Sequence, residues 1–314
     1  MKLFIVIALC LTITLGRRIR NPKTPVPTRQ NDYTKYFPKG RNQDACGSCW
    51  AFSTAAYLSA FFKRTSYTGQ GIPQISPEFF VDCNRKVPIK ELGWYQGQIY
   101  GNDACDGGRP GLALIFAIDS IGHKFPLPTL EQYKPPMSTL FGFFDKQMTT
   151  RCNKYVEEAK SLPVPEYQKV LTNYHADYKA NITSNDQLRD LIDAVGPVIA
   201  QVNFDPTFMT SLKNFWKRKI KYFSSQDCGK GDGDHALIVA GYTQKMIDGE
   251  MKNVWIIRNS WENKNKDEGE NEFIYFDADV ANMCGIWDFL TFLMPEGQGY
   301  NIRTSSKNKS RFFK

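Results

Sequence analysis

Histidine is scarce in this sequence: it occurs three times in 314 residues, at positions too far apart to form a closely spaced pair. A structural zinc site needs about four Cys or His ligands with short spacings. Cys46 and Cys49 form one such pair in "CGSC", but no second pair completes the set. A thioredoxin-type redox pair would need a strand–helix–strand context, which the order of elements below does not offer. We therefore expect no metal and no cofactor.

Concentrated basic stretches and membrane-length apolar runs are also missing. The net charge is +8, but Lys and Arg are scattered, whereas nucleic-acid binders gather them on one face, so we expect no nucleic-acid partner. The long apolar run at residues 3–15 is short for a bilayer span, which needs about 20 residues. With one early lysine and small residues near Gly16, residues 1–16 are typical of a secretory signal peptide. A membrane anchor is the alternative; after signal removal we expect no membrane association.

Secretion changes the meaning of the cysteines. There are eight, and Cys10 lies within the expected signal, which leaves seven. Disulfides form in the oxidising secretory route, and an odd number leaves at least one thiol without an intramolecular partner. The parity does not say which one.

Helical patterns dominate the first half of the chain. Residues 17–40 lack apolar periodicity and are expected to form a short extended arm. Residues 49–64 are apolar on most faces, without Gly or Pro, which predicts a buried central helix. A second helix is predicted over 111–121, with a long irregular region before it. Residues 123–152, rich in Pro and Gly, are expected to be irregular as well.

The second half has a different texture. Ser184 and Gln187 predict a capping box for a helix that Gly196 ends. Four short β-branched or aromatic runs then predict strands: "PVIAQVNF", "HALIVAGYT", "NVWIIRNSW" and "EFIYFDA". Helices first and strands second indicate an α+β fold. Residues 297–314 are expected to be a flexible basic tail.

Cys49 begins the predicted central helix. Unpaired N–H groups and the dipole at a helix N-terminus stabilise a thiolate, and a neighbouring histidine cation lowers a thiol pKa to about 3–4. We expect Cys49 to be such a nucleophile at acidic pH, and Cys46 to be a disulfide partner.

The string "QDACGSCWAF" resembles the active-site signature of the papain family of cysteine peptidases. Further similarity lies in "SPEFFVDC", "CDGGRPG", "DHALIVAGY" and "WIIRNSW", so it covers most of residues 42–294. The resemblance implies a two-lobed peptidase domain over 41–296, nearer the cathepsin L type. It has a helical lobe at about 41–152, a β-barrel-like lobe at about 160–294 and the active-site cleft between them.

The resemblance also implies the roles of individual residues. Cys49 is the nucleophile, and His235 shares its proton and then protonates the leaving amine. Asn259 orients the imidazole, Trp261 shields that hydrogen bond, and Gln43 with the Cys49 N–H forms the oxyanion hole.

Other positions are implied to contact the substrate. Gly107 and Gly108 would bind the substrate backbone in an extended pose, and the carbonyl of Asp234 would accept from the opposite wall. A pocket for the second residue before the cut is implied to be lined by Pro110, Gln201, Ala236 and Phe289, with Phe289 making it shallow.

The family's pattern implies three disulfides: Cys46–Cys105, Cys83–Cys152 and Cys228–Cys284. Cys49 is then the unpaired cysteine that the parity requires. Asn181 and Asn308 begin N-x-[ST] sequons that are expected to be glycosylated in the secretory pathway.

Some features depart from the family. The arm does not amount to a full inhibitory pro-segment, the loop 84–104 is long, and the segment after Trp261 lacks the usual glycine. The tandem histidines of the cathepsin B type are absent, which favours an endopeptidase.

We expect a secreted or lysosomal cysteine endopeptidase that is monomeric, acts on protein or peptide substrates and is bound by cystatin-like inhibitors. A catalytically silent papain-like binding protein is the alternative.

Overall fold

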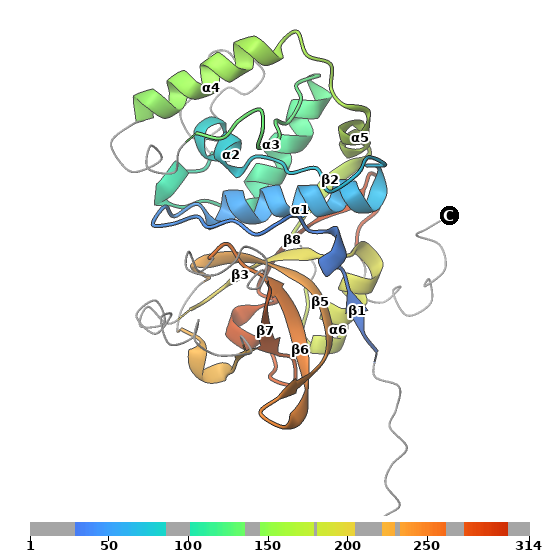
Figure 1. The fold of residues 1–314 in the computed structure, drawn as a ribbon. Helices are drawn as coiled ribbons and strands as arrows, with labels where there is room; N and C mark the ends of the chain where they lie inside the picture. The colour runs from blue at the N-terminus through green and yellow to red at the C-terminus, as the bar shows by residue number, and fades with distance from the viewer. Residues whose placement is uncertain are drawn as a thin grey trace, which may run out of the picture.

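Figure 1 shows the protein as a layer of helices packed against a twisted sheet. The computed structural model describes residues 29–85, 101–135, 145–178, 181–204, 222–229, 233–261 and 273–300. The helices are α1 (Cys49–Thr65), α2 (Pro77–Cys83), α3 (Pro110–Gly122), α4 (Asp145–Ala159), α5 (Glu166–Lys169) and α6 (Asn185–Val195). The strands are β1 (Asn31–Asp32), β2 (Tyr174–Asp177), β3 (Val198–Val202), β4 (Tyr222–Phe223), β5 (His235–Ile247), β6 (Glu250–Arg258), β7 (Phe273–Asp277) and β8 (Phe289–Pro295). The order is that of an α+β fold, as the sequence predicts.

The strands form an eight-stranded sheet in the order β2-β8-β3-β5-β6-β7-β4, with β1 added to β5. The pairings are antiparallel except that of β4 with β7. In Figure 1, α1–α5 gather in one half of the molecule, while α6 and most of the sheet make up the other. This arrangement places the beginnings of α1 and β5, which carry the expected catalytic pair, at the junction of the two halves.

The sheet has a different partner on each face. Along β3, Ile199 belongs to the core shared with α1–α4, whereas Val198, Ala200 and Val202 belong to the core shared with α6. The first eight residues of β5 are buried in succession because both of its faces are covered. A strand covered on both faces is a continuous apolar run rather than an alternating one, which is the pattern of "HALIVAGY".

Helix α1 is the central helix that the sequence predicts. Most of its residues are buried, and Trp50, Leu58 and Phe62 are fully so. Its last turn carries Lys63 and Arg64, which favour the negative end of the helix dipole. This buried helix therefore fixes the position of Cys49, its first residue.

Two helices lie where irregular structure was expected, so that prediction was wrong in those places. Helix α2 begins at Pro77, and the Ser76 hydroxyl accepts from the Phe79 N–H. Helix α4 begins at Asp145, inside the range expected to be irregular. Arg151 of α4 forms a bidentate ion pair with buried Asp82 of α2, at 2.7 and 2.8 Å. Tertiary contacts thus hold these helices, and local periodicity does not reveal them.

The capping of α6 differs in one detail from the prediction. Ser184 accepts from the Gln187 N–H at 3.2 Å, as expected. The Gln187 side chain reaches back to the N–H of Thr183, at 2.7 Å, rather than to that of Ser184. Thr183, one residue before Ser184, is therefore also hydrogen-bonded to the first turn of the helix.

Three disulfides join Cys46 to Cys105, Cys83 to Cys152 and Cys228 to Cys284. These are the pairs that the family resemblance implies. Each closes a long loop, and such a bond contributes about 2–4 kcal/mol to stability. Among the described residues, Cys49 is the free cysteine.

The described part of the expected arm, from residue 29, is held against the sheet half. Arg29 pairs with Asp190 of α6 at 2.6 Å, and Asn31 lies in β1 beside β5. Farther along, the Arg258 guanidinium donates to the carbonyl of Pro38 at 2.9 Å. The chain therefore crosses from the sheet half to α1 just before the residues of the site.

Several expectations fall outside the described residues: the signal at 1–16, the arm before residue 29, the tail beyond 300 with Asn308, and most of the loop 84–104. Asn181 is described and is exposed, with φ of 44°. Within the ranges given above, the helices are all too short or too polar to cross a bilayer.

Candidate active site

Cys49 is the first residue of α1, and the turn before it is fixed by the neighbouring loop. The Gly47 N–H donates to the carbonyl of Cys105 at 2.9 Å, next to the Cys46–Cys105 disulfide. A Cβ at Gly47 would lie 2.3 Å from that carbonyl oxygen, so only glycine fits there. The turn thereby holds the thiol at the helix N-terminus.

His235 opens β5, and Asn259 follows the last residue of the neighbouring strand β6. The His235 Nε2 and Asn259 Oδ1 atoms are 2.8 Å apart. Asn259 Oδ1 also accepts from the Ser260 N–H at 2.8 Å, which identifies it as the oxygen. Because this oxygen only accepts, Nε2 carries the proton and Nδ1 is left as the basic nitrogen.

Aromatic rings surround the imidazole. Trp261 stacks on His235 with ring centroids 4.0 Å apart and an angle of 28° between the planes. Phe204 contacts both rings, at 5.5 Å from His235 and 5.6 Å from Trp261. His235 is 4% exposed, so its hydrogen bond to Asn259 lies in an apolar enclosure.

Gln43 links the two halves of the molecule at the site. Its backbone N–H donates to the Ser260 carbonyl at 2.9 Å, and its Oε1 accepts from the Ser260 hydroxyl. Its Nε2 donates one hydrogen bond to the Cys46 carbonyl at 2.8 Å. An amide nitrogen has two donors, so the second N–H of Gln43 is available to a ligand in the cleft.

A cleft of about 490 Å³ runs over these residues. It is lined by Gln43, Gly47, Cys49, Cys105, Asp106, Gly107, Gly108, Gln201, Phe204, Gly233, Asp234, His235, Ala236 and Trp261. The structure thus brings together most of the residues that the sequence proposes, from α1, the loop before α3, β3 and β5. A volume of this size suits a ligand site.

Three proposed residues lie off the cleft lining. Asn259 lies behind His235, Pro110 is buried as the first residue of α3, and Phe289 is 50% exposed at the start of β8. Register places Gln201 between Ala236 on β5 and Phe289 on β8. Directly opposed residues share one face of a sheet, so Phe289 borders the cleft beyond Gln201.

The wall opposite β5 carries the two glycines of "CDGG". Gly107 has φ of +112°, which favours glycine. A Cβ at Gly108 would lie 2.6 Å from Asn102 Oδ1 and 2.8 Å from a Trp50 ring carbon. The backbone at Gly108 is therefore open on its cleft side and fully packed behind.

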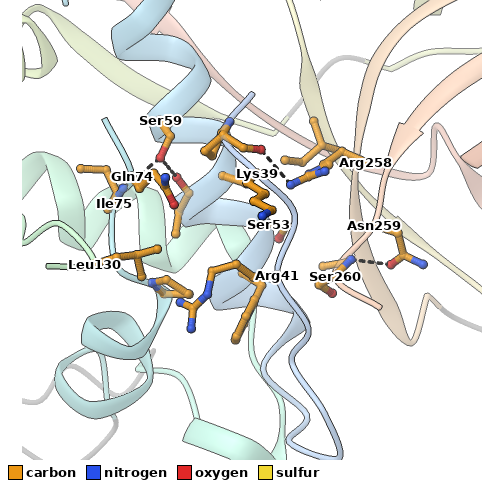
Figure 2. A pocket seen from close by; sticks show the side chains of 17 residues that line it. Lys39, Arg41, Ser53, Ser59, Gln74, Ile75, Leu130, Arg258, Asn259 and Ser260 are labelled. Carbon is orange, nitrogen blue, oxygen red and sulfur yellow. Dashed lines mark hydrogen bonds between the residues drawn. The ribbon is translucent and has the colours of Figure 1, made fainter. Parts of the chain in front are cut away.

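A second cavity of about 40 Å³ lies behind the site (Figure 2). Asn259 and Ser260 lie on one side of it, and Ser59, Gln74 and Ile75 lie across from them. Ligand pockets usually measure about 300–1,000 Å³, so the cleft is a far better candidate for the substrate site than this cavity.

Loss of hydration is the main influence on the pKa values of Cys49 and His235, the two groups expected to react. Burial raises the pKa of the Cys49 thiol, because the thiolate loses hydration. The N–H groups of Ala236, Trp50 and Cys49 lower that pKa and the Asp234 carboxylate raises it, but these effects are smaller. Burial also lowers the pKa of His235 from 6.5 to about 4, opposed by the hydrogen bond to Asn259.

The expectation of a lowered thiol pKa was therefore wrong. At Cys49, which is half-buried, the loss of hydration raises the pKa more than the N–H groups at the start of α1 lower it. At neutral pH the shifts favour a neutral thiol and a neutral imidazole in the same cleft.

Two residues of the site were missed in the sequence. Ser260 lies inside the quoted "NSW" string and holds Gln43. Phe204, two residues after the end of β3 in "VNF", has no local signal, because its contacts with His235 and Trp261 are long-range. Among the described residues no group of three or more His, Cys, Asp or Glu side chains could hold a metal ion.

An unpaired thiol and a histidine bonded to an asparagine, set around one cleft of an α+β fold, are the components of thiol-dependent acyl transfer. The protein class they indicate is that of the thiol hydrolases. The family model described as "Papain family cysteine protease" matches residues 26–293. The chain therefore belongs to the papain family of cysteine proteases and is a cysteine-type peptidase.

Individual relatives of the chain are also cysteine proteinases and cathepsins. "Cysteine proteinase 2" of Zea mays is 31% identical over 281 residues, covering 88% of this chain and 62% of the relative. "Cathepsin 7" of Rattus norvegicus is 25% identical over 285 residues, covering 90% and 70%. "Procathepsin L" of Felis catus is 26% identical over 258 residues, covering 82% and 62%. The chain thus spans about two thirds of the length of these relatives.

Solved structures show the same fold. The bromelain protease from Ananas comosus in complex with the E64 inhibitor has a TM-score of 0.57 at 19% identity, covering 86% of this chain and 100% of that chain. Digestive procathepsin L 3 of Tenebrio molitor larval midgut has a TM-score of 0.56 at 18% identity, covering 88% and 74%. At these identities the likeness concerns the papain-like fold alone.

Proposed function

We propose that this protein is an endopeptidase that cleaves extended polypeptides through Cys49, His235, Asn259 and Gln43. The Cys49 Sγ attacks the peptide carbonyl while its proton passes to His235, most directly to Nδ1, which gives a thiolate–imidazolium pair as the bond forms. His235 then delivers the proton to the leaving amine, and a thioester acyl-enzyme remains. Water, with its proton taken by His235, releases the acid and restores the thiol.

The observation that carries the proposal is the 2.8 Å bond between His235 Nε2 and Asn259 Oδ1 beside the cleft that holds the free thiol. This bond fixes one tautomer of the imidazole and leaves Nδ1 as the base. The low pKa of His235 keeps the imidazole neutral above about pH 4, the form that accepts a proton. The thiol of Cys49, which lines the cleft, is then activated by general-base transfer.

The tetrahedral intermediate places a negative oxygen near the start of α1. The Cys49 N–H and the second N–H of Gln43 are the donors proposed for it. A single donor of this kind stabilises the transition state by about 2.7–4 kcal/mol. The hydrogen bonds of Gln43 to Cys46 and Ser260 orient the amide before substrate arrives.

The proposed substrate is a polypeptide segment in an extended conformation. The Gly108 backbone, packed against Trp50, forms one wall, and Asp234, just before β5, forms the other with Ala236 of β5. Backbone hydrogen bonds to both walls would align the chain as an added strand. Side chains then select mainly at the wall formed by Gln201.

We further propose a secretory destination, either lysosomal or extracellular. The three disulfides are stable in an oxidising compartment. Exposed Asn181 is accessible to glycosylation. We propose that the protein acts as a monomer and that cystatin-like inhibitors occupy the same cleft as the substrate.

The test is alkylation of the purified protein with iodoacetamide at pH 5, with peptide mapping to locate the label. We expect rapid labelling at Cys49 that is lost in His235→Ala, together with internal cleavage of a denatured protein substrate. Cys49→Ser should bind the substrate without cleaving it. If labelling is slow and the same in both proteins, His235 does not activate Cys49, and the silent binding protein is favoured.

A further inference from the structure

Phe204 occupies an unusual position among the aromatic residues of the sheet half. Its ring is 4% exposed and lines the cleft beside His235. It contacts both the imidazole and the indole of Trp261, and those two rings stack on each other. The three rings thus contact one another pairwise, and the imidazole is in the group.

The backbone of Phe204 is tied to the chain just before His235. Its N–H donates to the Asp234 Oδ1 at 3.2 Å, and the Asp234 N–H donates to the carbonyl of Val202 at 3.0 Å. The preceding residue, Asn203, donates to the Cys284 carbonyl at 2.9 Å, next to the Cys228–Cys284 disulfide. Behind the ring, Phe223 packs at 5.7 Å. Phe204 is therefore held by contacts on several sides.

A single hydrogen bond does not fix an imidazole. The bond to Asn259 holds Nε2 but leaves the ring plane free to tilt about that contact. The stacked Trp261 limits the tilt, and Phe204, inclined at 37° to the imidazole, provides a second apolar surface. A tilt would change the direction in which Nδ1 points into the cleft and admit water to the Asn259 contact, and even about 1 Å of misplacement costs about 100-fold in rate.

We propose that Phe204 is a positioning residue for the proton transfer: with Trp261 it fixes the plane of the His235 imidazole and keeps water from its hydrogen bond to Asn259. This inference rests on the proposed role of His235 as the base. A purely structural role would stabilise the fold without any influence on the protonation of His235, and the two roles differ in pH dependence.

The test compares Phe204→Leu, which keeps apolar volume but loses the flat ring, with Phe204→Tyr, which keeps the ring. Phe292→Leu is the matched control: Phe292 is 0% exposed in the same core, and its ring contact is with Tyr300. For each protein, the rate constant of iodoacetamide with Cys49 is measured from pH 3.5 to 8, together with kcat, KM and the Tm.

In Phe204→Leu, we expect the pH at which the alkylation rate falls on the acidic side of the profile to rise by about half a pH unit or more. Solvent reaches the imidazole in this variant, so its pKa returns toward 6.5. At its own plateau, kcat should fall about 10-fold with little change in KM. Phe204→Tyr should keep the wild-type profile. Phe292→Leu should lower the Tm as much as Phe204→Leu does and leave the profile unchanged.

An unshifted profile in Phe204→Leu, or an equal shift in Phe204→Tyr or Phe292→Leu, would overturn the assignment of Phe204. Failure of the underlying mechanism is recognised separately. In that case His235→Ala, measured in the same series, labels at Cys49 with the wild-type rate and profile.

Discussion

Removing the titration of His235 should change how stability depends on pH. The pKa of His235 is about 4 in the folded protein, against 6.5 for the ordinary side chain. The unfolded chain therefore takes up a proton as the pH falls below 6.5, whereas the folded chain takes it up only near pH 4. Between these values the unfolded state binds more protons, so the free energy of unfolding decreases as the pH falls.

The magnitude follows from the shift. One pKa unit corresponds to about 1.36 kcal/mol, so the fall from 6.5 to about 4 removes about 3 kcal/mol of stability below pH 4. His235→Gln cannot titrate and can still donate to Asn259. We expect this variant to escape that loss, so that its stability relative to the parent rises by about 3 kcal/mol between pH 7.5 and pH 3.5.

The assay is urea unfolding followed by circular dichroism at several pH values, with disulfides intact. Both proteins carry Cys49→Ser, which prevents self-digestion. Other buried acids, such as Asp82, titrate equally in both and cancel in the difference. A difference that stays constant with pH would refute the burial argument, and so would a relative loss by the Gln variant at low pH, which would mean that the folded protein favours the imidazolium.

Other expected outcomes follow from single contacts. Gln43→Ala should lower kcat/KM about 100- to 1,000-fold while Cys49 still alkylates, as shown by steady-state kinetics and labelling. Arg151→Met leaves the Asp82 carboxylate buried and should cost about 3–5 kcal/mol in urea unfolding; the added change Asp82→Asn should restore much of it. Gly108→Ala places a Cβ 2.6 Å from a side-chain oxygen and should weaken peptide hydrolysis, with kcat/KM as the readout. Gln201→Leu should raise the ratio of kcat/KM for leucine over glutamine peptides matched at the contacting position, and an unchanged ratio would remove Gln201 from the substrate wall.

The elements with strong local signals could be predicted from the sequence. The helix over 49–64 has no Gly or Pro and is apolar on most faces, so its core environment is visible in one window of residues. The strand "HALIVAGYT" reads as buried because both faces of β5 pack against other elements. In each case the local sequence pattern and the tertiary environment favour the same secondary structure.

Elements and contacts that depend on residues far away in the sequence could not be predicted from local patterns. Helix α2 is seven residues long, and α4 lies beyond a Pro-rich region; the ion pair of Asp82 with Arg151 joins them across 69 positions. Phe204 and His235 are likewise adjacent only in space. Protonation is the clearest case, because "CGSCW" specifies a helix N-terminus but not how much water the finished cleft removes from Cys49.

The contact between Gln43 and Ser260 has a mechanical consequence. Gln43 lies in the segment before α1, and Ser260 follows Asn259 after β6, so this contact joins the proposed oxyanion donor to the loop proposed to orient the imidazole. If the two halves hinged apart at this contact, both proposed supports of the reaction would be lost together. We therefore expect a substrate to enter a cleft whose two walls stay joined at this contact.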